Sequence, residues 1–272
     1  GSEMCIRDRS VVDEEGLYEI FMLGPAKTIG KAIFKDICEL PPAFCLTYKN
    51  GEIKTYPYWK LEAKEFDENE ETAAEHTYLL VKDSIERQLV SDVPLATFLS
   101  GGLDSSIISK IASDIYNKSG KTLDTYSVDY TDNDKYFKKS LFQPNKDSDY
   151  IDVISSYIGS NHHNIVLNNV DVANALEEAA IERGVPGFVD IDSSLMLFCK
   201  EVKKDFTVCL SGECADEIFA GYPWYHKKEI LFENVFPWAR NTNIRQRILK
   251  NGFLSDGEEY LQSAYKNTLK NI

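Results

Sequence analysis

The sequence predicts an α/β fold in which a parallel sheet is covered by helices on both faces, preceded by a short β-rich segment. Short apolar runs alternate with segments of helical periodicity through residues 72–272, which is the pattern of a parallel sheet. Two of these runs end in turns rich in Gly, Ser and acidic residues, at 100–106 and 211–217. Because ligands of such sheets bind at the carboxyl ends of the strands, both turns mark one candidate site. A chain of 272 residues, 43% of them apolar, is long enough for a sizeable core.

The N-terminal part of the chain divides into three segments. Residues 1–10 show no periodicity, and we expect them to be a cloning or sequencing remnant outside the fold. Residues 11–60 contain two strand signals joined by Asn50-Gly51, a favoured centre for a two-residue hairpin turn. Because so few strands are not stable alone, we interpret this segment as the C-terminal end of a larger β-rich domain. Residues 61–71 are acidic and poor in apolar residues, which indicates a linker.

The remaining elements follow in order from Thr72. We expect a helix to begin there, with an apolar stripe that includes Tyr78, Leu79 and Ile85 and lies in the core. The polar stretch 132–146 reads as a long functional loop. Apolar runs predict strands, and 3.6-residue periodicity predicts helices, at the following places: strands at 93–99, 123–130, 163–167 and 206–210; helices up to 117 and over 149–158, 170–182 and 193–203.

The stretch Ser-Gly-Gly-Leu-Asp-Ser-Ser at 100–106 joins a buried strand to a helix. Its glycines allow the backbone to approach a ligand, and the helix N-terminus favours an anion. Asp104 is placed to hold Mg²⁺ against phosphate oxygens. The lysine of the G-x-x-x-x-G-K-[ST] phosphate loop is missing, so this is another kind of nucleotide loop. A Gly-Gly turn with a Ser or Asp helix cap is the plainer alternative, and the second turn argues against it.

The second turn, Ser211-Gly212-Glu213-Cys214-Ala215-Asp216-Glu217, follows the last predicted strand. Its three acids are spaced i, i+3 and i+4, which predicts that they lie on one side of a first helical turn. Acids at this place can simply complement the helix dipole. Beside Asp104 at the same sheet edge, they instead form a cluster suited to Mg²⁺ and one general base.

Four stretches of the chain together resemble one known family. They are 100–106, Tyr126-Ser127-Val128-Asp129, 211–217 and Phe219-Ala220-Gly221-Tyr222. In this order they resemble the glutamine-hydrolysing asparagine synthetases of the ATP-pyrophosphatase (PP-loop) superfamily. Residues 11–60 resemble the C-terminal end of that family's class II glutaminase domain. The resemblance implies an adenine nucleotide alpha hydrolase-like, Rossmann-like fold for residues 72–272, truncated at its C-terminal end.

The resemblance also implies roles for individual residues. The pyrophosphate and Mg²⁺ would be held by Ser100, Gly101, Gly102, Leu103, Asp104, Ser105 and Ser106. The adenosine would contact Leu99 and Val128, largely through their backbone, and the ATP would lie along Ser211 and Gly212. The catalytic residues would be Glu213, which assists formation of the intermediate or attack by ammonia, and the two metal-binding residues Asp104 and Asp216.

The sequence departs from the family pattern in three places. Most of the glutaminase domain is missing from this chain, and Cys5 is not expected to act as its nucleophile. Cys214 stands where the family often has glycine. We expect the family's chain to continue beyond residue 272, so that a phosphate-binding lysine has no position here.

The implied function is the ATP-dependent amidation of aspartate to asparagine through β-aspartyl-AMP, with release of AMP and pyrophosphate. ATP and Mg²⁺ are the implied cofactors, and ammonia would come from glutamine through a glutaminase domain in the same chain. Formation of a homo-oligomer is left open. Two alternatives also stay open: a related adenylating amidotransferase acting on another carboxylate, and a nucleotide-binding fragment without catalysis.

Composition narrows the remaining function classes. A net charge of −14 argues against nucleic-acid binding, which requires a basic face. No apolar run approaches the roughly 20 residues of a membrane span, and no signal peptide is visible, so we expect no membrane partner. The six cysteines lack metal-binding spacing, which indicates reduced core thiols in a cytoplasmic protein.

Overall fold

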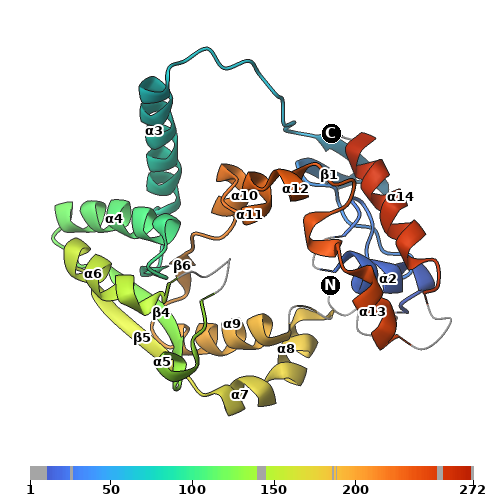
Figure 1. Ribbon diagram of the computed structural model, residues 1–272. Helices are drawn as coiled ribbons and strands as arrows, with labels where there is room; N and C mark the ends of the chain where they lie inside the picture. Colours follow the sequence, from blue (N-terminus) through green and yellow to red (C-terminus); the bar gives the residue numbers. More distant parts are fainter. Residues whose placement is uncertain are drawn as a thin grey trace. The chain divides into compact units, whose positions relative to one another are not determined.

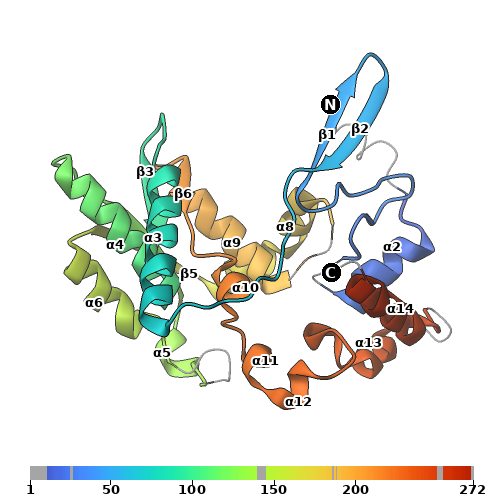
Figure 2. The same cartoon turned by 90° about the horizontal axis from the view of Figure 1, so that it is seen from above.

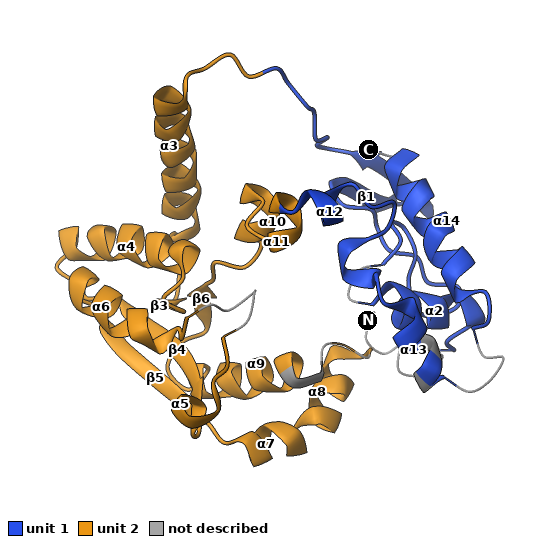
Figure 3. Cartoon of the chain, viewed as in Figure 1, with its two compact units in different colours: residues 1–65, 227–272 blue, residues 66–226 orange. Residues whose placement is uncertain are grey.

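The computed structural model of the chain describes residues 11–24, 27–139, 145–185, 187, 189–249 and 254–270. These residues fall into two compact units (Figure 3). Unit 1 combines Gly1–Glu65 with Lys227–Ile272, and unit 2 is Phe66–His226. The expected remnant at residues 1–10 lies outside the described residues.

Unit 2 is built on a four-stranded sheet with the order β5-β4-β3-β6. All three pairings are parallel, which confirms the predicted fold class. All four strands overlap the strands predicted from the sequence, and three of the four hold buried residues. The strands are β3 (Leu95–Phe98), β4 (Asp124–Tyr130), β5 (Asn161–Leu167) and β6 (Val208–Leu210).

The helices of unit 2 alternate with these strands, as expected. The segment predicted as one helix over 170–182 is divided into two helices, and Ala175 is both the C-cap of the first and the N-cap of the second. The helices are α3 (Glu70–Gln88), α4 (Leu103–Lys118), α5 (Asn133–Tyr136), α6 (Ser148–Ile158), α7 (Asn169–Asn174), α8 (Leu176–Arg183), α9 (Val189–Val202), α10 (Ala215–Phe219) and α11 (Pro223–His226).

Helices cover both faces of the sheet (Figures 1 and 2). On one face, α9 brings Phe198 and Val202 against Ala96 of β3 and Tyr126 of β4. On the other face lie α4 and α6, and Ser113 of α4 donates a 2.8 Å hydrogen bond to a carbonyl of α6. Burial of this apolar surface is the main driving force that fixes the sheet and so the loops at its edge.

Helix α3 differs from its expected packing. It begins where Asn69 accepts a 3.0 Å hydrogen bond from the Thr72 backbone, a normal helix cap. Of its apolar stripe only Ile85 is buried, whereas Tyr78 and Leu79 are 54% and 51% exposed. The expectation that the whole stripe is core is therefore wrong, because within unit 2 only its C-terminal part meets a neighbouring element.

The N-terminal part of unit 1 contains the expected hairpin. Strands β1 (Phe44–Lys49) and β2 (Glu52–Pro57) pair antiparallel around Asn50 and Gly51, whose φ angles are 54° and 84°. Positive φ at both central residues is the geometry that an Asn-Gly turn favours. Before the hairpin lie α2 (Glu14–Tyr18) and the π-helical turn η1 (Glu19–Leu23).

The C-terminal segment of the chain packs against these N-terminal residues. It contains α12 (Lys228–Leu231), η2 (Pro237–Ala239), α13 (Thr242–Ile248) and α14 (Gly257–Lys270). Leu23 forms a buried cluster with Ala239, Leu261 and Ala264. These units are defined by contacts in space, so the assignment of residues 11–60 to a glutaminase domain, and of 72–272 to a single domain, stays a prediction.

The cysteines are less buried than expected. All five described cysteines are free thiols, but Cys38, Cys199 and Cys214 are exposed and the other two are half-buried. The expectation of core thiols is therefore wrong for the described residues, since an apolar neighbourhood in sequence does not decide which side of an element faces solvent.

Candidate functional site

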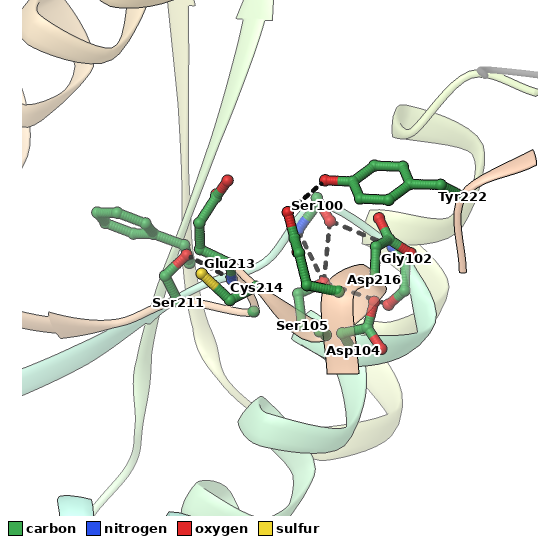
Figure 4. A pocket seen from close by; sticks show the side chains of 13 residues that line it. Ser100, Gly102, Asp104, Ser105, Ser211, Glu213, Cys214, Asp216 and Tyr222 are labelled. Atoms are coloured by element: carbon green, nitrogen blue, oxygen red, sulfur yellow. Dashed lines mark hydrogen bonds between the residues drawn. The ribbon is translucent and has the colours of Figure 1, made fainter. Parts of the chain in front are cut away.

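The two sequence turns meet because of the sheet topology. From β3 the chain passes to β4 and β5 on one side and later returns to β6 on the other side. Parallel sheets bind ligands at such a switch point, outside the carboxyl ends of the strands. There a pocket of about 260 Å³ is lined by Phe98, Ser100, Gly102, Asp104, Ser105, Ser211, Gly212, Glu213, Cys214, Ala215, Asp216, Glu217 and Tyr222 (Figure 4).

Hydrogen bonds within the first turn hold its hydroxyls in place. The Ser105 hydroxyl accepts from the Ser100 backbone N–H at 3.2 Å and contacts the Ser100 hydroxyl at 3.0 Å. The Ser100 hydroxyl in turn accepts from the Gly102 N–H at 3.3 Å. Gly102 caps α4 without a side chain, so the helix N-terminus beside the pocket carries no side-chain cap. This turn is a preformed set of donors at a helix N-terminus, which favours an anion.

Gly101 is required by both its conformation and its surroundings. Its φ is +79°, and a Cβ there would lie 2.8 Å from the carbonyl oxygen of Asp147 and 3.1 Å from Tyr150. L-residues with side chains rarely adopt this φ, and no space exists for a methyl group. The backbone of the turn therefore lies against the start of α6.

Gly212 lets the second turn reach the first. A Cβ at Gly212 would lie 3.1 Å from the Ser105 nitrogen and 3.2 Å from the Asp104 side chain. Glu213 does not lie on the following helix, as its spacing predicted, because Cys214 has φ +70° and α10 begins only at Ala215. All three acids of this turn nevertheless line the same pocket.

Four carboxylates line the pocket, and none of its described lining residues is Lys, Arg or His. Burial, and then the nearby Asp216 carboxylate, raise the pKa of Asp104. Asp216 folds back against Gly221, where a Cβ would lie 1.9 Å from Oδ1 of Asp216. An acidic pocket of this kind needs a cation before it can hold an anionic ligand.

Tyr222 and Glu217 also belong to the pocket. Glu217 was expected as a member of the acidic cluster without a role of its own, and Tyr222 was not among the residues expected to bind or react. The Tyr222 hydroxyl donates to Glu217 Oε1 at 2.9 Å, and its ring stacks on Trp224 with centroids 4.3 Å apart. Burial and then Glu217 raise the pKa of Tyr222 to about 12, so the hydroxyl keeps its proton at neutral pH. The Gly-Tyr pair that follows the acidic helix start is the sequence signal that could have indicated Tyr222.

The other expected residues take different positions around this pocket. Leu99 is 1% exposed and lies behind the turn, whereas the Leu103 side chain is 75% exposed. Ser106 donates to the Gly102 carbonyl at 2.6 Å and does not line the pocket. Val128 lines a separate cavity of about 390 Å³ beside β4, β5 and α6.

No group of three or more His, Cys, Asp or Glu side chains in the described part of the chain is arranged to hold a metal ion. Nor do the described residues include a helix with the length and apolarity that crossing a membrane requires.

The chain is an α/β protein with an acidic, Gly- and Ser-rich pocket at the switch point of a parallel sheet. Residues 76–270 match the family described as asparagine synthase. The chain is 46% identical over 261 residues, 95% of its length, to the glutamine-hydrolyzing asparagine synthetase 3 of Bacillus subtilis (strain 168). The chain therefore belongs to the asparagine synthase family.

Two further relatives are more distant. The identity is 29% over 83% of this chain to asparagine synthetase 1 of Bacillus subtilis (strain 168), and 26% over 82% of this chain to asparagine synthetase B of Escherichia coli (strain K12). The matched regions cover 42%, 34% and 41% of the three relatives, so the chain spans less than half the length of each.

Proposed function

We propose that this chain contributes the site at which aspartate is amidated to asparagine with ATP, through β-aspartyl-AMP. The relatives carry the name of glutamine-hydrolyzing asparagine synthetases. The observation that carries the proposal is the close approach of Gly212 to Asp104 and Ser105, which joins the phosphate-type turn and the acidic turn in one pocket.

The donor set of the pocket fits a magnesium nucleotide. Mg²⁺ usually binds one or two protein carboxylates together with substrate phosphates and water, and the Asp216 carboxylate is near enough to raise the pKa of Asp104. The bound ion would supply the positive charge that the lining residues lack. The hydroxyls and N–H groups of Ser100–Ser105 would orient the pyrophosphate part, and the backbone near Leu99 and Val128 the adenosine.

The proposed reaction balances without an oxidant or reductant. An oxygen of the aspartate side chain bonds to the α-phosphorus of ATP, and the bond from that phosphorus to the bridging oxygen breaks, so pyrophosphate leaves. Ammonia nitrogen then bonds to the activated carbonyl carbon, and AMP leaves with its oxygen. Glu213 lines the pocket and would accept the proton that the attacking nitrogen loses. Exclusion of water protects the acyl adenylate from hydrolysis.

The wider setting is part of the same proposal. Ammonia would come from glutamine through a class II glutaminase domain, of which residues 11–60 are the C-terminal end. The free thiols of the described residues agree with a reducing compartment, the cytoplasm. The expected partners are small molecules, namely ATP, aspartate and ammonia.

The test supplies the chain with ATP, Mg²⁺, ammonium and aspartate, and measures pyrophosphate, asparagine and bound nucleotide. We expect aspartate-dependent pyrophosphate release that falls at least about a hundredfold in Glu213→Gln and Asp104→Asn. Glu229→Gln, an exposed acid of α12, is the control and should retain full activity.

Three results would contradict the proposal in different ways. Pyrophosphate release with other carboxylic acids but not aspartate identifies a related ligase. Nucleotide binding without pyrophosphate release from any acid identifies a binding module. If the chain does not bind Mg·ATP at all, the pocket is not a nucleotide site.

A further inference from the structure

Unit 1 holds a second cavity that the proposed reaction does not use. Its volume is about 820 Å³, within the usual range of small-molecule sites. Its lining residues come from η2 and α13, the residues before them and one residue of α14, all in the C-terminal segment. The lining residues are Glu233, Asn234, Val235, Pro237, Trp238, Arg240, Asn241, Arg245 and Gln262.

The two arginines of this cavity differ in their partners. Arg240 forms a two-pronged ion pair with Glu233, with both N–O distances at 2.7 Å, and so is neutralised. Among the described residues, no carboxylate lies within ion-pair distance of Arg245. As far as the described residues go, the cavity wall therefore carries one positive charge that no carboxylate pairs with, in a chain whose net charge is −14.

The Arg245 guanidinium is held in a fixed orientation. Its Nη1 donates to the Met22 carbonyl at 2.6 Å and its Nη2 to the Trp238 carbonyl at 3.0 Å. Its head packs on Gly24, where a Cβ would lie 3.1 Å from both terminal nitrogens. A guanidinium has five N–H donors, so these two bonds leave donors for a ligand. Half-burial lowers the pKa of Arg245, which shows that part of its hydration is already lost.

The other walls suit the organic part of a ligand. Asn234, Asn241 and Gln262 supply side-chain amides. Trp238 is 37% exposed and stacks on Phe236 with centroids 5.2 Å apart, so the indole is rigid yet accessible. An oriented arginine beside a rigid aromatic ring is typical of sites that bind small anions with an apolar or flat body.

We propose that this cavity binds a small organic anion whose carboxylate or phosphate group pairs with Arg245 and whose body packs on Trp238. Inorganic phosphate and succinate are the two probes, because they separate the two sources of the negative charge. Binding of either probe would support an anion site at Arg245, and the probe that binds more tightly shows whether the site prefers a phosphate or a carboxylate group.

The three tryptophans of the chain allow a direct test. Indole N–H signals of the ¹⁵N-labelled full chain are recorded by NMR while each probe is added at constant ionic strength, with Trp238→Phe for assignment. We expect a saturable shift of the Trp238 signal. Trp224 stacks on Tyr222 of the nucleotide pocket, so its signal reports separately on phosphate binding there.

Two variants and one control make the result decisive. Arg245→Gln removes the charge, and Gln262→Glu supplies a competing carboxylate while leaving the bonds of Arg245 to Met22 and Trp238 in place. Each should weaken binding about tenfold or more. Lys266→Gln, an exposed residue of α14, makes the same charge change as Arg245→Gln and should leave the affinity unchanged.

Two outcomes overturn the proposal. One is the absence of a saturable Trp238 shift with both probes. The other is a shift that survives in Gln262→Glu, which shows that the ion does not bind at this guanidinium even if Arg245→Gln proves too unstable to measure. Neither outcome bears on the amidation reaction, which is read at Trp224 and by pyrophosphate release.

Discussion

Cys214 holds a left-handed backbone conformation, with φ +70°, directly between Glu213 and the start of α10. This conformation costs a residue with a Cβ about 1 kcal/mol, a cost that glycine avoids. We expect Cys214→Gly to raise the free energy of unfolding of unit 2 by about 1 kcal/mol, measured by urea titration. Cys214→Ala is the matched control, because it removes the sulfur but keeps the Cβ, and it should give no gain. Equal gains from both variants would assign the effect to the thiol.

Asp104 makes the stability of the metal-free chain depend on pH. Burial and Asp216 raise its pKa, so folding disfavours its ionised form. Below about pH 4, the ordinary pKa range of Asp, the carboxyl is protonated in both the folded and the unfolded state, so it does not lower the free energy of unfolding. As pH rises through the folded pKa, the native state loses stability relative to a neutral side chain. Asp104→Asn should therefore be more stable than the parent at pH 7 and equal to it near pH 3.

The control for this prediction is Asp114→Asn on the same helix. Asp114 pairs with Lys110 at 2.5 Å on the surface, so its removal should cost about 0.3–0.5 kcal/mol at pH 7, the opposite sign. Urea titrations at both pH values, without Mg²⁺ or nucleotide, measure the difference. A loss of stability in Asp104→Asn at pH 7 would contradict the assigned cause of the pKa shift.

At the residue scale the sequence predicted the first turn better than the second. In the first turn, the positive φ of Gly101 and the hydrogen bonds of Ser100, Gly102 and Ser105 follow from the residue types themselves. A loop of this kind could therefore be predicted from the sequence. The roles of Glu217 and Tyr222 depend on a hydrogen bond across a chain reversal at Ala220 and Gly221, which no helical spacing encodes. The assigned roles of all these residues stay predictions until variants are measured.

The loop between β3 and α4 gives a prediction at the scale of an element. Gly101 lies just before α4 and Gly120 just after it, with φ angles of +79° and +68°. A Cβ at Gly101 would meet neighbouring atoms within 4 Å, whereas a Cβ at Gly120 would meet none. Gly101→Ala should weaken Mg·ATP binding and cost about 2 kcal/mol or more, since a shift of the loop from Asp147 is added to backbone strain.

Gly120→Ala isolates the strain alone. It should cost about 1 kcal/mol and leave nucleotide affinity unchanged. Equilibrium dialysis of labelled ATP and urea titration of both variants measure the two effects. If both variants bound ATP like the parent, the first turn would not be the nucleotide site.

The elements themselves were largely readable from the sequence. Strands buried on both faces of a sheet favour continuous apolar runs, and β3 and β6 lie in such runs, whereas β4 and β5 mix apolar and polar residues. The exposed stripe of α3 was not readable, because periodicity reports an apolar face but not whether another element covers it. The helix α10 also begins later than the spacing of the acids predicted. Position 214 adopts a left-handed conformation but is a cysteine, so no glycine in the sequence indicated it.

At the scale of the whole molecule, unit 1 depends on contacts between its two chain segments. The buried Glu19 carboxylate accepts from the Thr28 N–H at 2.7 Å and from the Tyr260 hydroxyl, 241 residues away in sequence. Tyr260→Phe leaves this carboxylate with an unsatisfied oxygen, which should cost about 1–3 kcal/mol. The pocket proposed to bind the nucleotide should be unaffected, because all its lining residues belong to unit 2.

Tyr265→Phe on the same helix is the control. Its hydroxyl makes only a 3.4 Å contact to the Glu233 carbonyl, so its loss should cost about 0.5 kcal/mol. Urea titration of both variants, together with ATP binding, measures the contrast. Equal costs would show that Glu19 does not need Tyr260.

This long-range packing was beyond sequence reasoning. Leu23 and Leu261 are ordinary apolar residues in short segments, and nothing local indicates that they share a core. Helical periodicity predicts that α14 has an apolar face but not which of the available surfaces receives it. The grouping of 227–272 with the N-terminal segment is therefore a finding of the structure alone.

The way unit 1 is assembled also sets an order of events during synthesis. The whole of residues 66–226 is translated between its two halves, so at about 5–20 residues per second Met22 and Leu23 wait roughly 10–50 s for α13 and α14. Unit 2 has all its strands by then and can close its sheet first. The apolar surface of Leu23 therefore stays without these C-terminal partners until the last helix of unit 1 has been made.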